Sequence, residues 1–568
     1  MNGPIHVVWF RRDLRLRDNE AIARAAIGDV PVLPCFVVDP WFYEQPEISA
    51  HRVRFLFESL ADLDTNLRER GNQLYIFSGT SVAVLQKLTQ QLQAQGYRPA
   101  LFFNRDVQVP YGVDRDRAIA RLYREQKLPI HLGLNYFLQP DGDRRSEWRD
   151  RYYSYLRQPQ HPTPKCIVSP NPLTLDIPQL GIPQLSFADL QQKYAHLWEN
   201  GTDFFRGGET RAQAALGSFL ESRYQGYHWK ISHPWLTQRG ATSHLSPHLT
   251  WGTISTRDAY QRTKARAAEL ADNPKATFAL KQFRDRLRWR DSAAQRLYLD
   301  PHCVHHNLYP EFDDCYTETL PTDVHLNRLQ AWQNGRTGFP LVDATMRQLR
   351  AIGWTNFRMR AMCATFLTIN CGISWHHGAL HYMNCLVDGD LAIDHWQWQA
   401  QAGITNPLAK TFRIYNPTKN LQEKDADLRF VHYWVPELRG YSLPDLLAGR
   451  YLGKCNYPAP ILDWNATRLI NGKRVSDLRA AVRDRLQHDQ QHGSSSEYLR
   501  AAKAKEITEK YRSAKDEQFR AYKQQELALG LNRPGNADNY LPGNKNHQRT
   551  YEQQELTLDR ERVEPDES

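Results

Sequence analysis

Charged and aromatic side chains are concentrated in residues 335–416, a stretch otherwise apolar enough to form a core. Arg358 and Arg360 lie where apolar residues recur at helical spacing, so their side chains point about 200° apart around that helix. A buried arginine needs a carboxylate or a phosphate, and Asp388 and Asp390 follow in the sequence. This pattern predicts either a structural ion pair beneath a packed core or a charged binding site.

Three hydroxyl side chains precede a predicted helix in the segment ATSHLSPHLTWG (241–252). We expect Ser246 to be the N-cap of this helix and Pro247 its first residue. Thr242 and Ser243 complete the group, and the free N–H groups of a helix N-terminus attract phosphate. The segment is a candidate phosphate site, although a plain capped helix satisfies the same pattern.

A third cluster is basic. Arg286 and Arg290 are four residues apart, on one face of a predicted helix, where like charges repel unless an anion lies between them. A solvent-exposed basic face is the alternative. Phe283, Leu287 and Trp289 lie on the same segment and favour partial burial.

The composition limits the class of protein. The chain has 568 residues, enough for two domains and a tail, and a net charge of +10, which suits a polyanionic partner. Its 15 Trp and 27 Tyr indicate polar cavities, stacking surfaces or redox relays in addition to core packing. The eight cysteines show no metal-binding spacing, so we expect no metal and reduced, buried thiols in a cytoplasmic protein. No signal sequence and no apolar run of membrane length is evident.

Residues 1–136 alternate between short apolar runs and amphipathic segments, which predicts an α/β domain with a doubly wound parallel sheet. The first loop after a strand, residues 11–19, contains no glycine, so it is not a dinucleotide-binding fingerprint. The predicted strands are 5–10, 33–38, 74–77, 100–103 and 130–132, and the predicted helices between them are 19–27, 51–70 and 81–95.

The rest of the chain has a different character. Residues 137–204 are rich in proline and are predicted to form an extended connector. Residues 205–485 are predicted to form an all-α domain, with helices at 210–223, 255–270, 275–299, 341–351, 355–371 and 378–387. Residues 486–568 form a charged tail, with one solvated helix at 498–525 and disorder from 532 onwards. This tail is either an inert extension or a segment that reaches a partner.

Several ordered motifs together resemble the cryptochrome/photolyase family. They are WFRRDLRLRDN (9–19), TSHLSP (242–247), GRTGFPLVDATMRQL (335–349), DGDLAIDHWQW (388–398) and FRIYNP (412–417). The resemblance covers residues 5–465. It implies an N-terminal antenna-type α/β domain, a helical domain that holds FAD in a bent, U-shaped form, and excitation of the flavin by blue light.

The resemblance also implies roles for particular residues. Asp394 falls where the family has a residue facing flavin N5, which is Asn in many photolyases and Asp in plant-type cryptochromes. A carboxylic acid there could protonate N5 if burial raised its pKa. The residues implied to bind FAD are Tyr227, Thr242, Ser243, His244, Leu245, Ser246, Arg286, Arg290, Asn356, Arg360, Asp388, Asp390 and Asp394.

Photoreduction in this family uses a chain of tryptophans from the flavin to the surface. Trp396 and Trp375 match the first two members by spacing, whereas Thr322 occupies the region of the third. We therefore expect a cavity bordered by Arg360, Asp388 and Trp396.

Other positions depart from the family's repair enzymes. Arg286 and Phe357 stand where enzymes that split cyclobutane dimers have Glu and Asn, and the paired histidines of (6–4) enzymes are missing. Trp289 and Trp398 match the aromatic walls of the lesion pocket, where a flipped base would stack. Arg358 could meet a DNA phosphate.

A second antenna chromophore, a folate or a deazaflavin, is possible, but Gln108 replaces the usual folate-binding carboxylate. The four clustered cysteines of iron–sulfur members are absent.

Three functions remain open on the sequence. The first is a DNA photolyase that splits pyrimidine dimers in single- or double-stranded DNA, favoured by the whole-chain pattern. The second is a blue-light photoreceptor that signals to a partner through its tail, favoured by Asp394. The third is a flavin-binding nucleic-acid protein with no photochemical role.

Overall fold

The computed structural model describes residues 3–43, 48–107, 110–139, 147–171, 175, 177, 180–316, 320–409 and 411–491. The expectations for the charged tail beyond residue 491 and for Gln108 lie outside these ranges.

Five parallel strands form one sheet with the order β3-β2-β1-β4-β5, which confirms the predicted doubly wound α/β fold. Each strand lies where an apolar run predicts it. The strands are β1 (Gly3–Phe10), β2 (Val32–Val38), β3 (Tyr75–Ser78), β4 (Tyr97–Arg105) and β5 (Ile130–Leu134).

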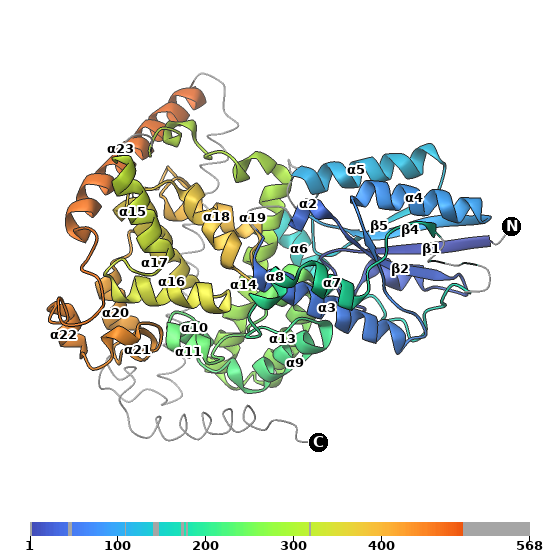
Figure 1. The fold of residues 1–568 in the computed structure, drawn as a ribbon, viewed down its shortest axis with the longest axis horizontal. Helices are drawn as coiled ribbons and strands as arrows, with labels where there is room; N and C mark the ends of the chain where they lie inside the picture. The colour runs from blue at the N-terminus through green and yellow to red at the C-terminus, as the bar shows by residue number, and fades with distance from the viewer. Residues whose placement is uncertain are drawn as a thin grey trace. The chain divides into compact units, whose positions relative to one another are not determined.

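Helices cover both faces of this sheet because alternate side chains of each strand point to opposite sides. On one face Val8 and Phe36 pack among apolar residues of α1 (Glu20–Ala25) and α3 (Ala50–Arg68). On the other, Val7 and Leu33 pack among those of α4 (Ser81–Ala94) and α5 (Pro110–Glu125). Figure 1 shows α4 and α5 together on one side of the strands and α3 on the other. A short helix, α2 (Pro40–Tyr43), follows β2.

The strand order reverses between β1 and β4, the place where open α/β sheets commonly bind ligands. Here Arg11, only 7% exposed, lies 4.7 Å from the ring centre of Trp9 and pairs with Asp116 at 2.6 Å. Arg115 stacks on Trp9 at 4.8 Å. The chain's own side chains therefore fill much of this position, and a second chromophore remains only a prediction.

The predicted connector is extended over much of its length but contains three short helices: α6 (Trp148–Arg157), α7 (Phe187–Lys193) and α8 (Ala195–Glu199). It runs beside the sheet, where Val32 donates a backbone hydrogen bond to Val168 and Ser78 donates one to Pro183, both at 2.8 Å. These bonds explain how a proline-rich segment stays attached to the α/β part.

In the remaining described residues all the regular elements are helices, as expected. No helix in the described ranges is both long and apolar enough to span a lipid bilayer. The helices are α9 (Glu209–Ser218), η3 (Phe219–Arg223), α10 (Tyr227–Lys230), α11 (Pro234–Gln238), α12 (Ser246–Trp251), α13 (Thr256–Glu269), α14 (Pro274–Leu299), η4 (Pro301–Val304), η5 (Pro310–Phe312), α15 (Thr322–Gln333), α16 (Pro340–Ile352), α17 (Phe357–Thr365), η6 (Phe366–Asn370), α18 (Trp375–Cys385), α19 (Leu391–Gln401), α20 (Pro417–Lys424), α21 (Arg429–Trp434), η7 (Pro436–Leu438), α22 (Leu443–Leu447) and α23 (Trp464–Gln491).

Three local expectations were wrong. Helix α12 begins one residue earlier than predicted, so Leu245 is its N-cap and Ser246 its first residue. The all-α domain was expected to end at residue 485, but helix α23 continues through that position, so the expected boundary lies inside a helix. All eight cysteines are free thiols, as expected, but Cys166 is exposed, and Cys385 and Cys455 are only partly buried.

A buried ion pair joins the loop after β1 to helix α13. Asp18 accepts hydrogen bonds from Arg257 and, at 2.6 Å, from the hydroxyl of Ser255. Both charged side chains are at most 3% exposed. Since an unpaired charge at this depth is costly, the pair fixes the α/β part against the helical part.

We expect Asp18→Ala to lower the free energy of unfolding by about 3–5 kcal/mol, because it leaves the Arg257 guanidinium buried without its carboxylate. Urea denaturation measures the loss. The matched control is Asp477→Ala, which breaks an exposed ion pair with Lys473 on α23 and should cost under about 1 kcal/mol. Equal losses in the two variants would contradict the structural role of Asp18.

Candidate functional site

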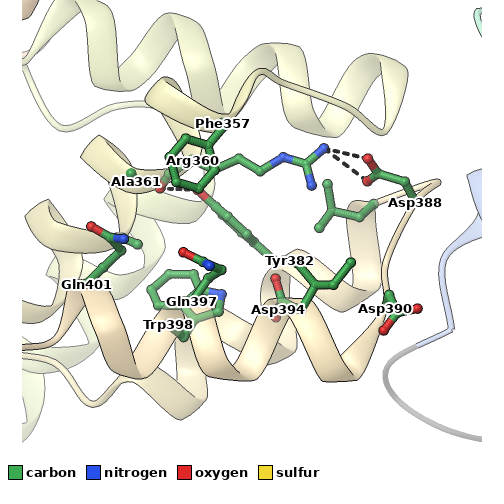
Figure 2. Close-up of a pocket in the computed structure, with 13 residues that line it drawn as sticks. Phe357, Arg360, Ala361, Tyr382, Asp388, Asp390, Asp394, Gln397, Trp398 and Gln401 are labelled. Atoms are coloured by element: carbon green, nitrogen blue, oxygen red, sulfur yellow. Dashed lines mark hydrogen bonds and ion pairs between the residues drawn. The ribbon is translucent and has the colours of Figure 1, made fainter. Parts of the chain in front are cut away.

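A cavity of about 80 Å³, partly open to solvent, lies among helices α17, α18 and α19. Its floor is aromatic and one wall carries charges (Figure 2). The residues that line it are Phe357, Arg360, Ala361, Ala364, Tyr382, Leu386, Asp388, Asp390, Ile393, Asp394, Gln397, Trp398 and Gln401.

The charged wall is built on an ion pair between Arg360 and Asp388. One terminal nitrogen, Nη2, lies 3.0 Å from both carboxylate oxygens, while Nε donates to the backbone oxygen of Thr355 at 2.8 Å. Asn356 caps α17 by accepting a hydrogen bond from the backbone of Met359, which fixes the direction of the helix that carries Arg360. Among the described residues, the other terminal nitrogen of Arg360 has no hydrogen-bond partner, so it is free to donate to a ligand.

Asp390 serves two structural purposes at the edge of the cavity. Its Oδ1 accepts a hydrogen bond from the backbone of Ala392 and so caps α19. Its Oδ2 lies 3.2 Å from Arg12, which also pairs with Asp106 at 2.7 Å. The cavity is thereby connected to the carboxyl ends of β1 and β4, a connection that the sequence pattern did not predict.

The third carboxyl group, Asp394, has no such partner. Burial raises its pKa to about 8, because desolvation and the negative charges of Asp388 and Asp390 outweigh the positive charges of Arg360 and Arg52. Its Oδ2 is buried and makes no hydrogen bond within the described part of the chain. At neutral pH this side chain is therefore mostly a neutral carboxylic acid that can donate a proton.

The aromatic floor consists of Trp398 and Tyr382. Their ring centres are 4.8 Å apart and nearly perpendicular, and Trp332 lies behind them at 6.1 and 5.8 Å. All three side chains are at most 2% exposed. In Figure 2, Tyr382 crosses the middle of the cavity between Arg360 and α19, and its hydroxyl donates to the backbone oxygen of Arg360 at 3.2 Å. Gly378 allows this packing, since a Cβ atom there would lie 2.2 Å from the Trp398 ring.

The structure agrees only in part with the predicted cavity, which was to be bordered by Arg360, Asp388 and Trp396. Arg360 and Asp388 border it, but Trp398 lines it in place of Trp396. Trp396 points away from the cavity, with the Arg296 guanidinium 3.6 Å from its ring centre. Trp375 is fully buried beside His376 and His395. Among the described residues no ring contact joins Trp375 to Trp396, so their proposed electron transfer has no direct geometric support.

The candidate phosphate loop is held by Arg223, which donates hydrogen bonds to the backbone oxygens of Gly240, Thr242 and Ser243. The hydroxyl oxygens of Thr242 and Ser243 accept from backbone N–H groups two residues ahead. The structure thus brings the predicted hydroxyls together at the start of α12, with Ser246 half-buried beside them.

Two other predicted members of this loop are used for packing. His244 donates from Nε2 to the backbone oxygen of Thr237, 2.8 Å away, and its ring contacts Phe205 and Trp354. Leu245 is fully buried in the helical core. Asn356 donates to Thr237 Oγ1 at 3.0 Å and thereby ties the loop to α17.

The basic cluster on α14 is partly buried, as its apolar neighbours indicated. Arg286 interacts with Tyr227, a phenol whose pKa burial raises to about 12, and lies 4.2 Å from the ring centre of Trp289. Arg290 is paired with Asp291 at 2.7 Å and donates to the backbone oxygen of Leu249 on α12 at 2.6 Å. None of these side chains belongs to the lining of the cavity on α17–α19.

The predicted DNA-contacting residues lie in different environments. Trp289 is 39% exposed, and Arg358 is half-buried over the ring of Tyr415. Trp398 is buried and forms the cavity floor. Phe357 is 48% exposed and lies at the rim. Arg358 and Arg360 do point to different partners, as their spacing predicted.

Several lining residues were missed from the sequence. Tyr382 lies seven residues after Trp375, two helical turns along α18, and this spacing was the available signal. Gln397 and Gln401 follow Asp394 at positions i+3 and i+7 on the same face of α19. No group of three or more His, Cys, Asp or Glu side chains in the described ranges is arranged to hold a metal ion.

Comparisons with known proteins agree with this architecture. Residues 6–154 match the sequence model of the DNA photolyase domain, and residues 283–477 match that of the FAD binding domain of DNA photolyase. A deoxyribodipyrimidine photo-lyase of Synechococcus sp. is 31% identical over 502 residues, which cover 85% of this chain and 98% of that protein. The chain belongs to the cryptochrome/photolyase family.

Both branches of the family are represented among its relatives. Cryptochrome-1 of Anopheles gambiae is 27% identical over 90% of this chain and 98% of its own length. The crystal structure of a class III photolyase from Agrobacterium tumefaciens, 27% identical, superposes with a TM-score of 0.70 over 84% of this chain and 98% of that one.

The residues of the cavity fit the flavin ring of FAD. A flavin needs a flat apolar contact surface, a donor for its carbonyl oxygens and acceptors for its N–H edge. Tyr382 and Trp398 supply the surface, the free nitrogen of Arg360 the donor, and the carboxylates the acceptors. The FAD-binding domain is therefore present with a cavity of suitable chemistry.

The raised pKa of Asp394 predicts a pH dependence of stability. Between 3.8, its ordinary value, and about 8 the folded state keeps a proton that the unfolded state releases. The contribution of Asp394 to the free energy of unfolding therefore falls as pH rises, by at most about 1.4 kcal/mol per pH unit. Asp394→Asn should flatten this decline in urea denaturation from pH 5 to 8. Parallel profiles for variant and wild type would mean that Asp394 ionises normally.

Proposed function

We propose that this protein is a blue-light-driven flavoprotein that splits pyrimidine dimers in DNA by electron transfer from reduced FAD. The observation that carries the proposal is the Arg360–Asp388 pair beside the buried rings of Tyr382 and Trp398, in one cavity of an FAD-binding domain. When bound, FAD supplies the light absorption and the transferable electron.

The protein's own residues have three tasks in this proposal. Arg360 orients the polar edge of the flavin with its free terminal nitrogen. The buried rings of Tyr382, Trp398 and Trp332 exclude water and offer an oxidisable indole next to the cavity. Asp394 holds a proton on its carboxyl group at neutral pH and can release it towards the cavity.

DNA is the proposed substrate because the named relatives include deoxyribodipyrimidine photo-lyases and because the net charge of +10 favours a polyanion. The exposed rings of Phe357 at the cavity rim and Trp289 on α14 can stack on an extrahelical base. Half-buried Arg358 beside Tyr415 supplies a positive charge for a phosphate.

A blue-light photoreceptor without repair activity is the second candidate. It is favoured by the protonated Asp394 and by Arg286 and Phe357, which replace the Glu and Asn expected of dimer-splitting enzymes. In that case a change of charge and protonation at the cavity would be the signal, and the segment beyond residue 491 would be available to a partner.

The deciding experiment is repair of lesion-containing DNA. Reduced, flavin-loaded protein under blue light should restore intact pyrimidines in single- or double-stranded DNA that carries cyclobutane dimers, as measured by chromatography of the digested product. A dark sample is the control. Normal photoreduction of the flavin with no repair in either form of DNA would exclude the photolyase and favour the photoreceptor.

The orientation of α19 predicts which tryptophan supplies an electron during photoreduction. Trp398→Phe should abolish or strongly slow the light-dependent bleaching of oxidised flavin, because it removes the indole at the cavity. Trp396→Phe is the matched control on the same helix and should have the smaller effect, since its ring faces Arg296. The reverse order of the two effects would restore Trp396 as the first donor.

A further inference from the structure

One buried histidine lies beside the proton-carrying residue of the cavity. The Nδ1 atom of His395 is 3.7 Å from Oδ2 of Asp394. Each of these two atoms is buried and has no hydrogen-bond partner elsewhere in the described part of the chain. A contact between these two neighbouring atoms would give each of them the hydrogen-bond partner that a buried polar atom needs.

Both groups are neutral at pH 7. Burial raises the pKa of Asp394 to about 8, and it lowers the pKa of His395 to about 3, helped by the neighbouring His376 and His305. Once Asp394 has released its proton, a neutral imidazole can protonate the carboxylate from Nδ1 while Nε2 takes up a proton, so no charged imidazole is left in the apolar site. A small rotation of either side chain shortens 3.7 Å to hydrogen-bond length.

Of the two residues, His395 is the one that connects Asp394 to the protein surface. Its ring contacts Trp375 at 5.5 Å between ring centres, and exposed His376 stacks on Trp375 at 3.8 Å. The side chain of His395 is itself 13% exposed. His376 in turn lies 3.3 Å from the backbone oxygen of His305.

The charged and titratable groups around the pair come from several elements. Those that act on Asp394 are Arg360 on α17, Arg52 on α3, Tyr382 on α18, and Asp388 and Asp390 before α19. Those that act on His395 are His376 on α18 and His305 after η4.

We propose that His395 is the proton relay that reloads Asp394 from solvent, an inference that rests on the proposed role of Asp394 as the proton donor in the cavity. Asp394 releases its proton towards the cavity from Oδ1, His395 passes the Nδ1 proton to Oδ2, and the other ring nitrogen, Nε2, takes a proton from water. One proton moves from solvent to the cavity and no electron is transferred, so the step needs no further reactant.

The exchange of the Asp394 proton with solvent tests this relay in the dark. Infrared spectroscopy identifies the C=O stretch of the protonated carboxyl group as the band that Asp394→Asn removes. When the full-length protein is transferred to D₂O, this band shifts to lower frequency as deuterium replaces the carboxyl proton. The rate of the shift is the rate of proton exchange. We expect His395→Ala to slow this exchange about 100-fold, the range of general acid–base catalysis. Added imidazole should restore the rate, which a purely structural role for His395 would not produce.

Two further variants complete the experiment. His395→Gln keeps a polar side chain of similar size but cannot relay a proton, so it should exchange as slowly as His395→Ala and guards against misfolding of the smaller variant. His377→Ala is the matched control, because His377 lies on the same surface but contacts His325. A wild-type exchange rate in both His395 variants, or no rescue by imidazole, overturns the proposal.

The relay and the proposed function fail in distinguishable ways. The infrared exchange is measured without light and without DNA, so it reports on His395 even if no photochemistry occurs. Loss of flavin photoreduction in the wild type would overturn the proposed function alone. Intact photoreduction with unchanged carboxyl exchange in the variants would overturn the relay alone.

Discussion

The ion pair between Arg360 and Asp388 is the interaction around which the cavity is organised. Burying either charge alone would be costly, so the two must stay together, and the two 3.0 Å hydrogen bonds leave little freedom in how they do so. Arg360 also donates to the backbone of Thr355. As a result the start of α17 and the loop before α19 are held at a fixed separation, and the cavity lies between them.

The same pair explains the protonation of its neighbour. Three carboxyl groups lie around the cavity, and two of them are in ion pairs: Arg360 pairs with Asp388, and Arg12 pairs with Asp390. Asp394 is desolvated and lies near two negative carboxylates, and both effects raise its pKa. The site thus contains two acceptors and one proton donor made from the same residue type. The difference between them comes from position and not from side-chain chemistry.

Much of the fold was predictable because local patterns determine it. The five strands follow their apolar runs, and helices such as α3, α14 and α16 follow their periodicity, whereas the longest helix, α23, was not predicted. An ion pair between Arg358 or Arg360 and a following aspartate was also predicted from the rule that a buried arginine needs a carboxylate, and the family resemblance pointed to Arg360 and Asp388. The contact between Arg12 and Asp390 was not, because its residues are 378 positions apart and only tertiary packing brings them together.

The tryptophan of the cavity was misassigned for a different reason. Matching the family motif by spacing pointed to Trp396, but helix geometry favours Trp398. Asp394 and Trp396 are two residues apart and diverge by about 200°, whereas Asp394 and Trp398 are four apart and share a face. The spacing in the sequence was therefore enough to place Trp398, and not Trp396, on the face of α19 that carries Asp394. Here helix periodicity is a better guide than the match to the family motif.

The cavity therefore has a rigid floor and a more adaptable rim. Trp398 is locked against α18 because Gly378 leaves no room between them, and the helix cannot accept even a methyl group there. At the rim, Phe357 is about half exposed, and Gln397 and Gln401 are partly exposed with rotatable amides. A precise site needs its reactive groups on rigid elements, which the floor provides. Discrimination between ligands then depends on the rim, to which Phe357, Gln397 and Gln401 belong.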